Sequence, residues 1–190
     1  MRLILASASP RRVDLLARIG VKPDAVVPAD VDESITKGEL PRQHALRLAG
    51  EKAAAIAARE PEALVLAADT VVAVGRRILP KVEDEATLRA CMKLLSGRRH
   101  RVLTGVALAV PGQDVRERLV ETMIAMKRLS EEEIDYYASH GEWRGKAGGY
   151  ALQGYGEVYV RHIAGSYSNV VGLPLAETRV LLKSAGYPLA

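Results

Sequence analysis

The stretch LILASASPRRVDLLARIG, residues 3–20, decides the fold class of this chain. Its first residues, 3–5, form a short apolar run typical of a buried strand. Pro10 stands where the first turn of a helix tolerates proline, and Ser9 before it is the expected N-cap. The apolar residues that follow recur at helical spacing: Val13, Leu15, Leu16 and Ile19. A strand that turns at once into a helix is the first unit of an α/β fold.

The turn itself, SASPRR at residues 7–12, allows two interpretations. It is either an ordinary capped turn with solvated arginines or an anion site. The second arises because hydroxyl groups, free helix N–H groups and two guanidinium groups converge on one small volume. The turn alone favours neither interpretation, so the rest of the chain has to distinguish them.

Beyond this unit, strand and helix patterns alternate along the chain. Helices are expected over residues 41–59, 84–97, 130–137 and 174–185, the third opened by a capping box from Ser130 to Glu133. Strands are expected over residues 25–27, 64–68, 71–74, 102–110, 115–126 and 158–163, with Asp69 and Thr70 interrupting the second and third. The turn at Pro111 and Gly112 joins two of them into a hairpin. The prediction is therefore an α/β fold whose sheet is mixed rather than all parallel, flanked by helices.

The composition is that of an ordinary globular domain. The 190 residues are 48% hydrophobic and 26% charged, and we expect one domain over residues 1–190. No apolar run is long enough to span a bilayer, and no signal peptide is recognisable, so a cytoplasmic location is expected. The single cysteine, Cys91, excludes an internal disulfide and a cysteine-based zinc site, and its helical surroundings predict a packed, inert thiol.

Charge and aromatic content argue against nucleic acid as the main partner. A net charge of +4 suits an anionic ligand but is too small to indicate nucleic-acid binding by itself. Aromatic residues are only 4% of the chain, with no phenylalanine, which leaves few platforms on which bases could stack.

Familiar catalytic motifs are absent from the sequence. It contains no G-x-x-x-x-G-K-[ST], no G-x-G-x-x-G after a strand, no H-E-x-x-H and no G-x-S-x-G. The four histidines are far apart and none pairs with another at ligand spacing: His44, His100, His140 and His162. A histidine-based metal site or a Ser/His triad is therefore not indicated.

Several charged residues remain as candidates for chemistry. Asp69 ends the run LVLAA, where it either caps a turn or lies at a strand end in a crevice that binds a ligand. Lys52 falls within a helical stripe of small apolar residues, while Glu33 and Lys81 lie in polar loops and alone would face solvent. Hydroxyls, arginines, lysines and carboxylates with almost no histidine are typical of metal-assisted phosphoryl chemistry.

Short motifs spread over nearly the whole chain carry a resemblance to a known family. They are SASPRR at 7–12, EK at 51–52, ADTVV at 68–72, Lys81, LSG at 95–97, TGVAL at 104–108, KAGGYALQG at 146–154 and VVGLPL at 170–175. Together they resemble the Maf family of nucleoside triphosphate pyrophosphatases. The resemblance implies an elongated α/β protein, similar in fold to inosine triphosphate pyrophosphatases, with a cleft between two lobes. It also implies hydrolysis of a nucleoside triphosphate to the monophosphate and pyrophosphate, with Mg²⁺ or Mn²⁺ as cofactor, and often a homodimer.

The resemblance also implies a role for each candidate residue. The phosphate-binding residues would be Ser7, Arg11, Arg12, Lys52 and Lys81. The acidic pair Glu33 and Asp69 would hold the metal ion, and Asp69 would be the general base.

Substrate choice is the third expectation. Residues at three positions match the branch of the family that acts on dTTP and UTP rather than on 7-methyl-GTP: Arg11, Thr70 and Gln153. Two positions depart from the family pattern, since Val82 stands where a proline is usual and Gly145 where an aspartate is common. These departures affect loop shape more than the set of charges, so they bear on substrate preference more than on the reaction.

Two alternatives to this prediction stay open. The first is a pyrophosphatase for modified or non-standard nucleotides, and the second is a nucleotide-binding regulator of cell division without turnover. A pure binder has little use for Asp69 and Glu33, because carboxylates repel a triphosphate unless a metal ion intervenes. The expected partners are a nucleoside triphosphate and a second copy of the chain, with neither nucleic acid nor a membrane.

Overall fold

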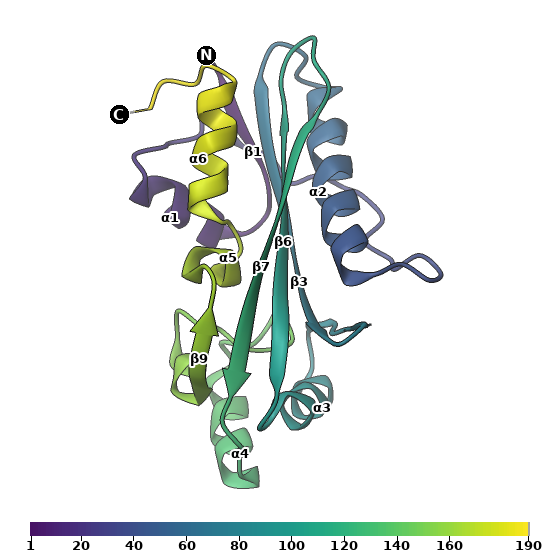
Figure 1. Cartoon of the computed structure of the whole chain (residues 1–190), viewed down its shortest axis with the longest axis vertical. Coiled ribbons are helices and arrows are strands. Elements are labelled where there is room, and N and C mark those ends of the chain that lie inside the picture. Colours follow the sequence, from purple (N-terminus) through teal and green to yellow (C-terminus); the bar gives the residue numbers. More distant parts are fainter. Residues whose placement is uncertain (190) are drawn as a thin grey trace.

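The main sheet forms the long axis of the protein (Figure 1). A computed structural model describes residues 1–189; Ala190, the last residue of the predicted domain, lies outside the described residues. The strands are β1 (Leu3–Ala6), β2 (Ala25–Val26), β3 (Leu64–Val74), β4 (Arg77–Ile78), β6 (Arg99–Ala109), β7 (Arg116–Met126) and β9 (Val160–Ala164). Their order is β2-β1-β3-β6-β7-β9, with β4 beside β3.

The sheet is mixed, as the sequence predicts. β1 runs parallel to β2 and β3, whereas β3, β6, β7 and β9 are successively antiparallel. β1 pairs with only the first part of β3, because its last residue, Ala6, lies opposite Ala67. The 11-residue strands β3, β6 and β7 continue far beyond β1 and connect the two ends of the molecule (Figure 1).

Helices cover both faces of the sheet. They are α1 (Pro10–Arg18), α2 (Pro41–Ala57), α3 (Glu85–Leu95), α4 (Glu131–His140), α5 (Tyr167–Val171) and α6 (Leu175–Ser184). Successive side chains of β3 point to opposite faces of the sheet, which decides which helix each residue contacts. Val65 and Ala67 share one core cluster with α2, and Val71 shares a second core cluster with α2. Leu64 and Leu66 point the other way and pack with residues of α1 and α6.

A second cluster on that opposite face makes the lower part of the molecule a lobe of its own (Figure 1). Val72 and Val102 pack there with residues of α3 and α4 and with the buried ring of Trp143. The lobe also contains a small sheet of β5 (Lys81–Val82) and β8 (Lys146–Ala147) and the 3₁₀ helix η1 (Tyr155–Tyr159). Two lobes joined by long strands confirm the predicted fold class.

Local signals at two helix starts and at Cys91 are confirmed. Ser130 accepts a hydrogen bond from the Glu133 N–H as the cap of α4, and Asp84 accepts one from the Thr87 N–H as the cap of α3. Cys91 is buried, and burial raises the pKa of its thiol, as expected of an inert cysteine. Across residues 1–189, the helices include none with the length and apolar character needed to cross a bilayer.

Several expected boundaries are wrong. β3 is one continuous strand, because Asp69 and Thr70 pair with Gly105 and Thr104 of β6 instead of interrupting it. α2 ends at Ala57 rather than Arg59, β6 begins at Arg99 rather than at residue 102, and β9 begins only at Val160, after η1. The short elements β4, β5, β8 and α5 were not expected at all, since two to five residues carry too little periodicity to be recognised.

Candidate active site

A cleft of about 390 Å³ lies between the two lobes. The β1–α1 turn and the start of α1 line one side, and Lys81 of β5 and the segment around β8 line the other. All nine sequence-predicted site residues line this cleft: Ser7, Arg11, Arg12, Glu33, Lys52, Asp69, Thr70, Lys81 and Gln153. The structure therefore brings the whole predicted set together.

The SASPRR turn is organised around Arg12. Its Nη1 donates to Ser7 Oγ (3.0 Å), its Nε to the Gly172 carbonyl (2.8 Å) and its Nη2 to Thr70 Oγ1 (3.4 Å). Burial lowers the pKa of Arg12, an effect that nearby Asp69 opposes. Since a guanidinium has five N–H donors and three are used here, two remain for a ligand.

Gly172 is a glycine for a geometric reason. Its φ of 126° lies in the region that side chains rarely adopt. Through this conformation its carbonyl accepts the Arg12 Nε–H, so the segment before α6 is tied to the β1–α1 turn. The predicted N-cap Ser9 makes no side-chain cap; instead its N–H donates to Ser7 Oγ (3.1 Å).

Arg11 differs from its neighbour. Within residues 1–189 it makes no hydrogen bond or ion pair, although burial lowers the pKa of its guanidinium. A partly buried cation without a protein partner is free to neutralise an anion in the cleft. The turn thus holds one arginine that is fixed by the protein and one that is available to a ligand.

Asp69 occupies a position that the sequence pattern misplaces. It lies in the middle of β3, not at a strand end, but next to the point where β1 stops. The edge of β3 is therefore open to the cleft at Asp69 and Thr70. Alternation sends their side chains to opposite faces of the sheet, so Asp69 meets α2 and Thr70 meets the turn. The expected crevice exists because the neighbouring strand ends there.

Lys52 is the cation on α2 that meets Asp69. The helix buries this residue, and Nζ lies 2.7 Å from Asp69 Oδ1 and 2.5 Å from Glu33 Oε1. Glu33 uses its second oxygen, Oε2, to accept a hydrogen bond from Lys81 in the other lobe. Although partial burial opposes ionisation, the bonds to Lys52 and Lys81 lower the pKa of Glu33 to about 2. Glu33 is therefore a charged bridge across the cleft, although its side chain remains partly exposed to solvent as its loop suggests.

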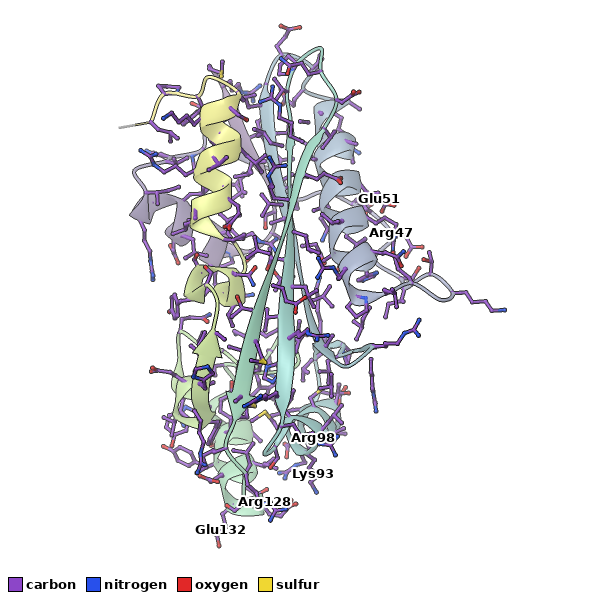
Figure 2. The ribbon with its side chains drawn as sticks, viewed as in Figure 1. Arg47, Glu51, Lys93, Arg98, Arg128 and Glu132 are labelled. Carbon is purple, nitrogen blue, oxygen red and sulfur yellow. The ribbon has the colours of Figure 1, made fainter. Side chains whose placement is uncertain are left out.

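The loop that carries Glu33 is anchored to α2 by Arg47. The Arg47 Nη2 donates to the Ser34 carbonyl (2.9 Å), and its Nε donates to Glu39 Oε1 (2.7 Å). His44 Nδ1 lies 2.8 Å from the same carboxylate of Glu39. Arg47 and Glu51 extend side by side from the side of α2 that faces away from the sheet (Figure 2). These contacts hold the loop where Glu33 can reach both lysines.

Thr70 belongs to a chain of hydrogen bonds that leads into the protein interior. Its Oγ1 lies 3.0 Å from Thr104 Oγ1, and Thr104 in turn donates to the Asn169 carbonyl (3.0 Å). Thr104 and Asn169 are fully buried and were missed by the sequence analysis. A signal was available, because the threonine in TGVAL sits at an otherwise apolar position of a strand.

The second lobe contributes further residues to the cleft. Gln153 is exposed in a turn before η1. Arg144, Lys146 and Tyr150 line the same side and were not singled out from the sequence, although KAGGYALQG contains two of them. Burial lowers the pKa of Lys146, and nearby Arg11 acts in the same direction.

The fit of a divalent cation depends on two carboxylates. No group of three or more potential metal-ligating residues occurs among residues 1–189. Glu33 and Asp69 nevertheless lie on either side of Lys52 Nζ, and Mg²⁺ usually takes one or two carboxylates together with substrate phosphates. The donor set therefore fits an ion that binds with a triphosphate rather than alone.

Comparisons with known proteins find close relatives of this chain. The Maf-like protein family model matches residues 2–185. A Caulobacter vibrioides protein named dTTP/UTP pyrophosphatase is 61% identical over 97% of this chain and 96% of its own length. A Novosphingobium aromaticivorans protein of the same name is also 61% identical, over 97% of this chain and 92% of its own.

One solved structure bears on the fold. The structure of a HAM1 protein from Coxiella burnetii superposes with a TM-score of 0.54, covering 97% of this chain and 100% of that one at 14% identity. At this identity the similarity shows a shared architecture only. The family match over nearly every residue, with relatives aligned from end to end, shows that the chain belongs to the family of Maf-like proteins.

Proposed function

We propose that this protein hydrolyses dTTP and UTP to the nucleoside monophosphate and pyrophosphate. The observation that carries the proposal is Asp69, a buried carboxylate in a cleft whose other charged lining residues are arginines, lysines and the partly exposed Glu33. Such a cleft suits a triphosphate, and its single buried acid suits activation of water. The relatives named dTTP/UTP pyrophosphatase support the same reaction.

In the proposed reaction, the cations hold the triphosphate and Asp69 handles the proton. Ser7, Arg11 and Arg12 bind phosphate oxygens from one side of the cleft. Lys52 binds them from α2, and Lys81 binds them from the second lobe. A water molecule attacks the α-phosphorus and gives its proton to Asp69. The bond from the α-phosphorus to the oxygen that bridges to the β-phosphorus breaks, and pyrophosphate leaves.

Glu33 and Asp69 are the residues that would hold the divalent cation. A bound Mg²⁺ or Mn²⁺ would neutralise charge on the phosphate oxygens during the reaction. Since both carboxylates are paired with Lys52 in the absence of ligand, the triphosphate is expected to draw Lys52 toward its own oxygens.

Substrate choice is proposed to depend on Arg11, Thr70 and Gln153. Gln153 carries both a donor and an acceptor, which suits the O4/N3 edge of uracil or thymine. The Thr70 hydroxyl already bonds Arg12 and Thr104, so we assign it the role of positioning Arg12 rather than of touching the base.

The remaining expectations are part of the same proposal: one domain over residues 1–190, a cytoplasmic location, a homodimer, and a nucleotide rather than nucleic acid or a membrane as partner. The cleft supports the single domain, since residues as distant in sequence as Ala6 and Gly172 line it together. A regulator without turnover is disfavoured, because Asp69 and Glu33 would weaken the binding of a triphosphate unless a metal ion intervenes.

A substrate panel tests the proposal. The purified protein is offered normal and modified nucleoside triphosphates with Mg²⁺ or Mn²⁺, and pyrophosphate release is measured. The expected result is the highest kcat/KM for UTP and dTTP. A higher kcat/KM for a modified nucleotide would favour a pyrophosphatase for modified nucleotides instead. Tight binding without pyrophosphate release would favour a nucleotide-binding regulator without turnover.

A further inference from the structure

One buried pair, of which Tyr150 lines the cleft and His100 lies behind it, has no role in the proposed phosphate chemistry. His100 lies on β6 and Tyr150 in the loop after β8, with His100 Nε2 2.7 Å from the Tyr150 hydroxyl. The rings meet edge to face at 5.4 Å between centroids. His100 is 2% exposed, and its other nitrogen, Nδ1, has no hydrogen-bond partner among the described residues.

The pair lies on the same sheet face as the rest of the cleft floor. Along β6, residues His100, Val102 and Thr104 alternate onto one face, and Val102 and Tyr150 both line the cleft. Thr104 contacts Thr70 beside Arg12, which marks the phosphate end. At about 3.3 Å per residue, His100 lies about 13 Å further along β6 than Thr104. Between the two ends the floor is apolar, formed by Val72 and Val102, which suits the sugar and the base.

The unpaired nitrogen indicates how the hydroxyl is oriented. Burial lowers the pKa of His100 to about 4, so at neutral pH the ring carries one proton. If Tyr150 donated to Nε2, that proton would be a buried Nδ1–H with no acceptor, an arrangement that native proteins rarely tolerate. With the proton on Nε2, the ring donates to the Tyr150 oxygen and Nδ1 carries no hydrogen; the hydrogen without a protein acceptor is then that of the Tyr150 hydroxyl, on a residue that lines the cleft and can meet a ligand.

We propose that Tyr150 is a specificity residue whose hydroxyl, held by His100, donates a hydrogen bond to the O4 carbonyl of uracil or thymine. Within a pyrimidine nucleotide, C4 lies opposite the nitrogen that carries the sugar, so O4 points away from the phosphates toward this end of the cleft. Cytosine has an amino group there, which cannot accept from Tyr150. Burial also raises the pKa of Tyr150, so the hydroxyl stays protonated as a donor. The proposal rests on UTP and dTTP being the substrates.

Tyr150→Phe is the direct test, because it removes the hydroxyl and keeps the ring. We expect kcat/KM for UTP to fall about ten-fold, the scale of one lost buried hydrogen bond, with little change for CTP. Tyr159→Phe is the matched control: its hydroxyl donates to the Glu133 carbonyl outside the cleft, so it is expected to lower thermal stability without changing the UTP/CTP ratio. An unchanged UTP/CTP ratio in Tyr150→Phe would overturn the proposal.

His100→Asn tests the positioning role. We expect it to lower the UTP/CTP ratio, and the double variant with Tyr150→Phe to have the ratio of Tyr150→Phe alone, because both changes remove the same contact. A further drop in the double variant would show that His100 acts independently of the Tyr150 hydroxyl.

Binding separates this proposal from the proposed function. The dissociation constants of α,β-methylene-UTP and α,β-methylene-CTP are measured for the wild-type protein and Tyr150→Phe. Loss of the uridine preference in the variant supports Tyr150 even if the wild-type protein fails to release pyrophosphate, which would overturn only the proposed reaction. Active wild-type protein with equal preference in the variant would overturn only the role of Tyr150.

Discussion

Asp69→Asn is expected to abolish most turnover while keeping the fold. The amide matches the carboxylate in shape but cannot accept the proton of the attacking water, so kcat should fall by about 10²–10⁴. Lys52 keeps its ion pair with Glu33 in this variant, so unfolding stability should change little. Pyrophosphate release and thermal unfolding measure the two effects. A folded variant with near-normal rates would show that Asp69 is not the base.

Arg12→Ala and Arg11→Ala form a matched pair at the start of α1. Each is expected to lower kcat/KM, because it removes about 2 kcal/mol of transition-state stabilisation, the scale of a charge-assisted contact. Only Arg12→Ala should also lower the melting temperature, because Arg12 bonds Ser7, Thr70 and the Gly172 carbonyl whereas Arg11 has no partner among residues 1–189. Unchanged kinetics in both variants would restore the interpretation of SASPRR as an ordinary capped turn.

Gln153→Glu is a third change at the scale of single residues. A carboxylate can only accept at the O4/N3 edge, so kcat/KM for UTP and dTTP should fall much more than thermal stability. Stability is expected to hold because Gln153 is exposed and lies in a turn. If the preference of UTP over GTP survives the substitution, Gln153 does not read the base.

At the scale of elements, the approach of α2 to β6 depends on Gly105. A Cβ built there would lie 2.3 Å from the Ala45 carbonyl oxygen, a backbone atom that cannot move aside. Gly105→Ala should therefore push α2 away and cost about 1–3 kcal/mol of unfolding free energy. Since Asp69 pairs with Gly105 and Lys52 lies on α2, activity should fall as well.

Gly50→Ala is the control for this prediction. A Cβ at Gly50 meets only the carboxylate end of the flexible Glu117 side chain, and alanine is favoured over glycine within a helix. Stability measured by urea unfolding should be unchanged or increased. Equal destabilisation by the two substitutions would show that steric contact at Gly105 does not set the position of α2.

At the scale of the whole molecule, Glu33 connects the lobes through Lys52 and Lys81. Because its pKa is lowered to about 2 in the folded protein, its stabilising effect is full above pH 5 and is lost as the pH falls toward 2. Glu33→Gln should cost on the order of 1 kcal/mol at pH 7, a value already reduced for solvent screening since the side chain is 38% exposed.

Urea unfolding of both proteins at several pH values checks this linkage. The stability difference between wild type and Glu33→Gln should shrink steadily below pH 5. A difference that stays constant down to pH 3 would mean that Glu33 contributes through packing and not through its charge.

Much of the architecture could be predicted from local patterns. Periodicity of two and 3.6 residues identifies strands and helices because it records which side chains face a core, and the caps at Ser130 and Asp84 are purely local chemistry. The strand break expected at Asp69 was wrong because it, too, was inferred from local pattern alone. A polar residue in an apolar run is typical of a strand end, and the pattern contains no information about Lys52 on the helix that covers it.

The sequence by itself therefore determined the α/β class, the mixed sheet and the set of charged residues suited to a triphosphate. Only the tertiary structure decided that β1 ends beside Asp69, that Glu33 bridges two lysines from different lobes, and that Gly172 receives Arg12 across 160 residues of chain. It alone also placed His100 under Tyr150. The physical reason is that these contacts arise from strand order and helix packing, which join segments far apart in sequence, whereas hydrophobic periodicity records only the burial of each segment's own faces.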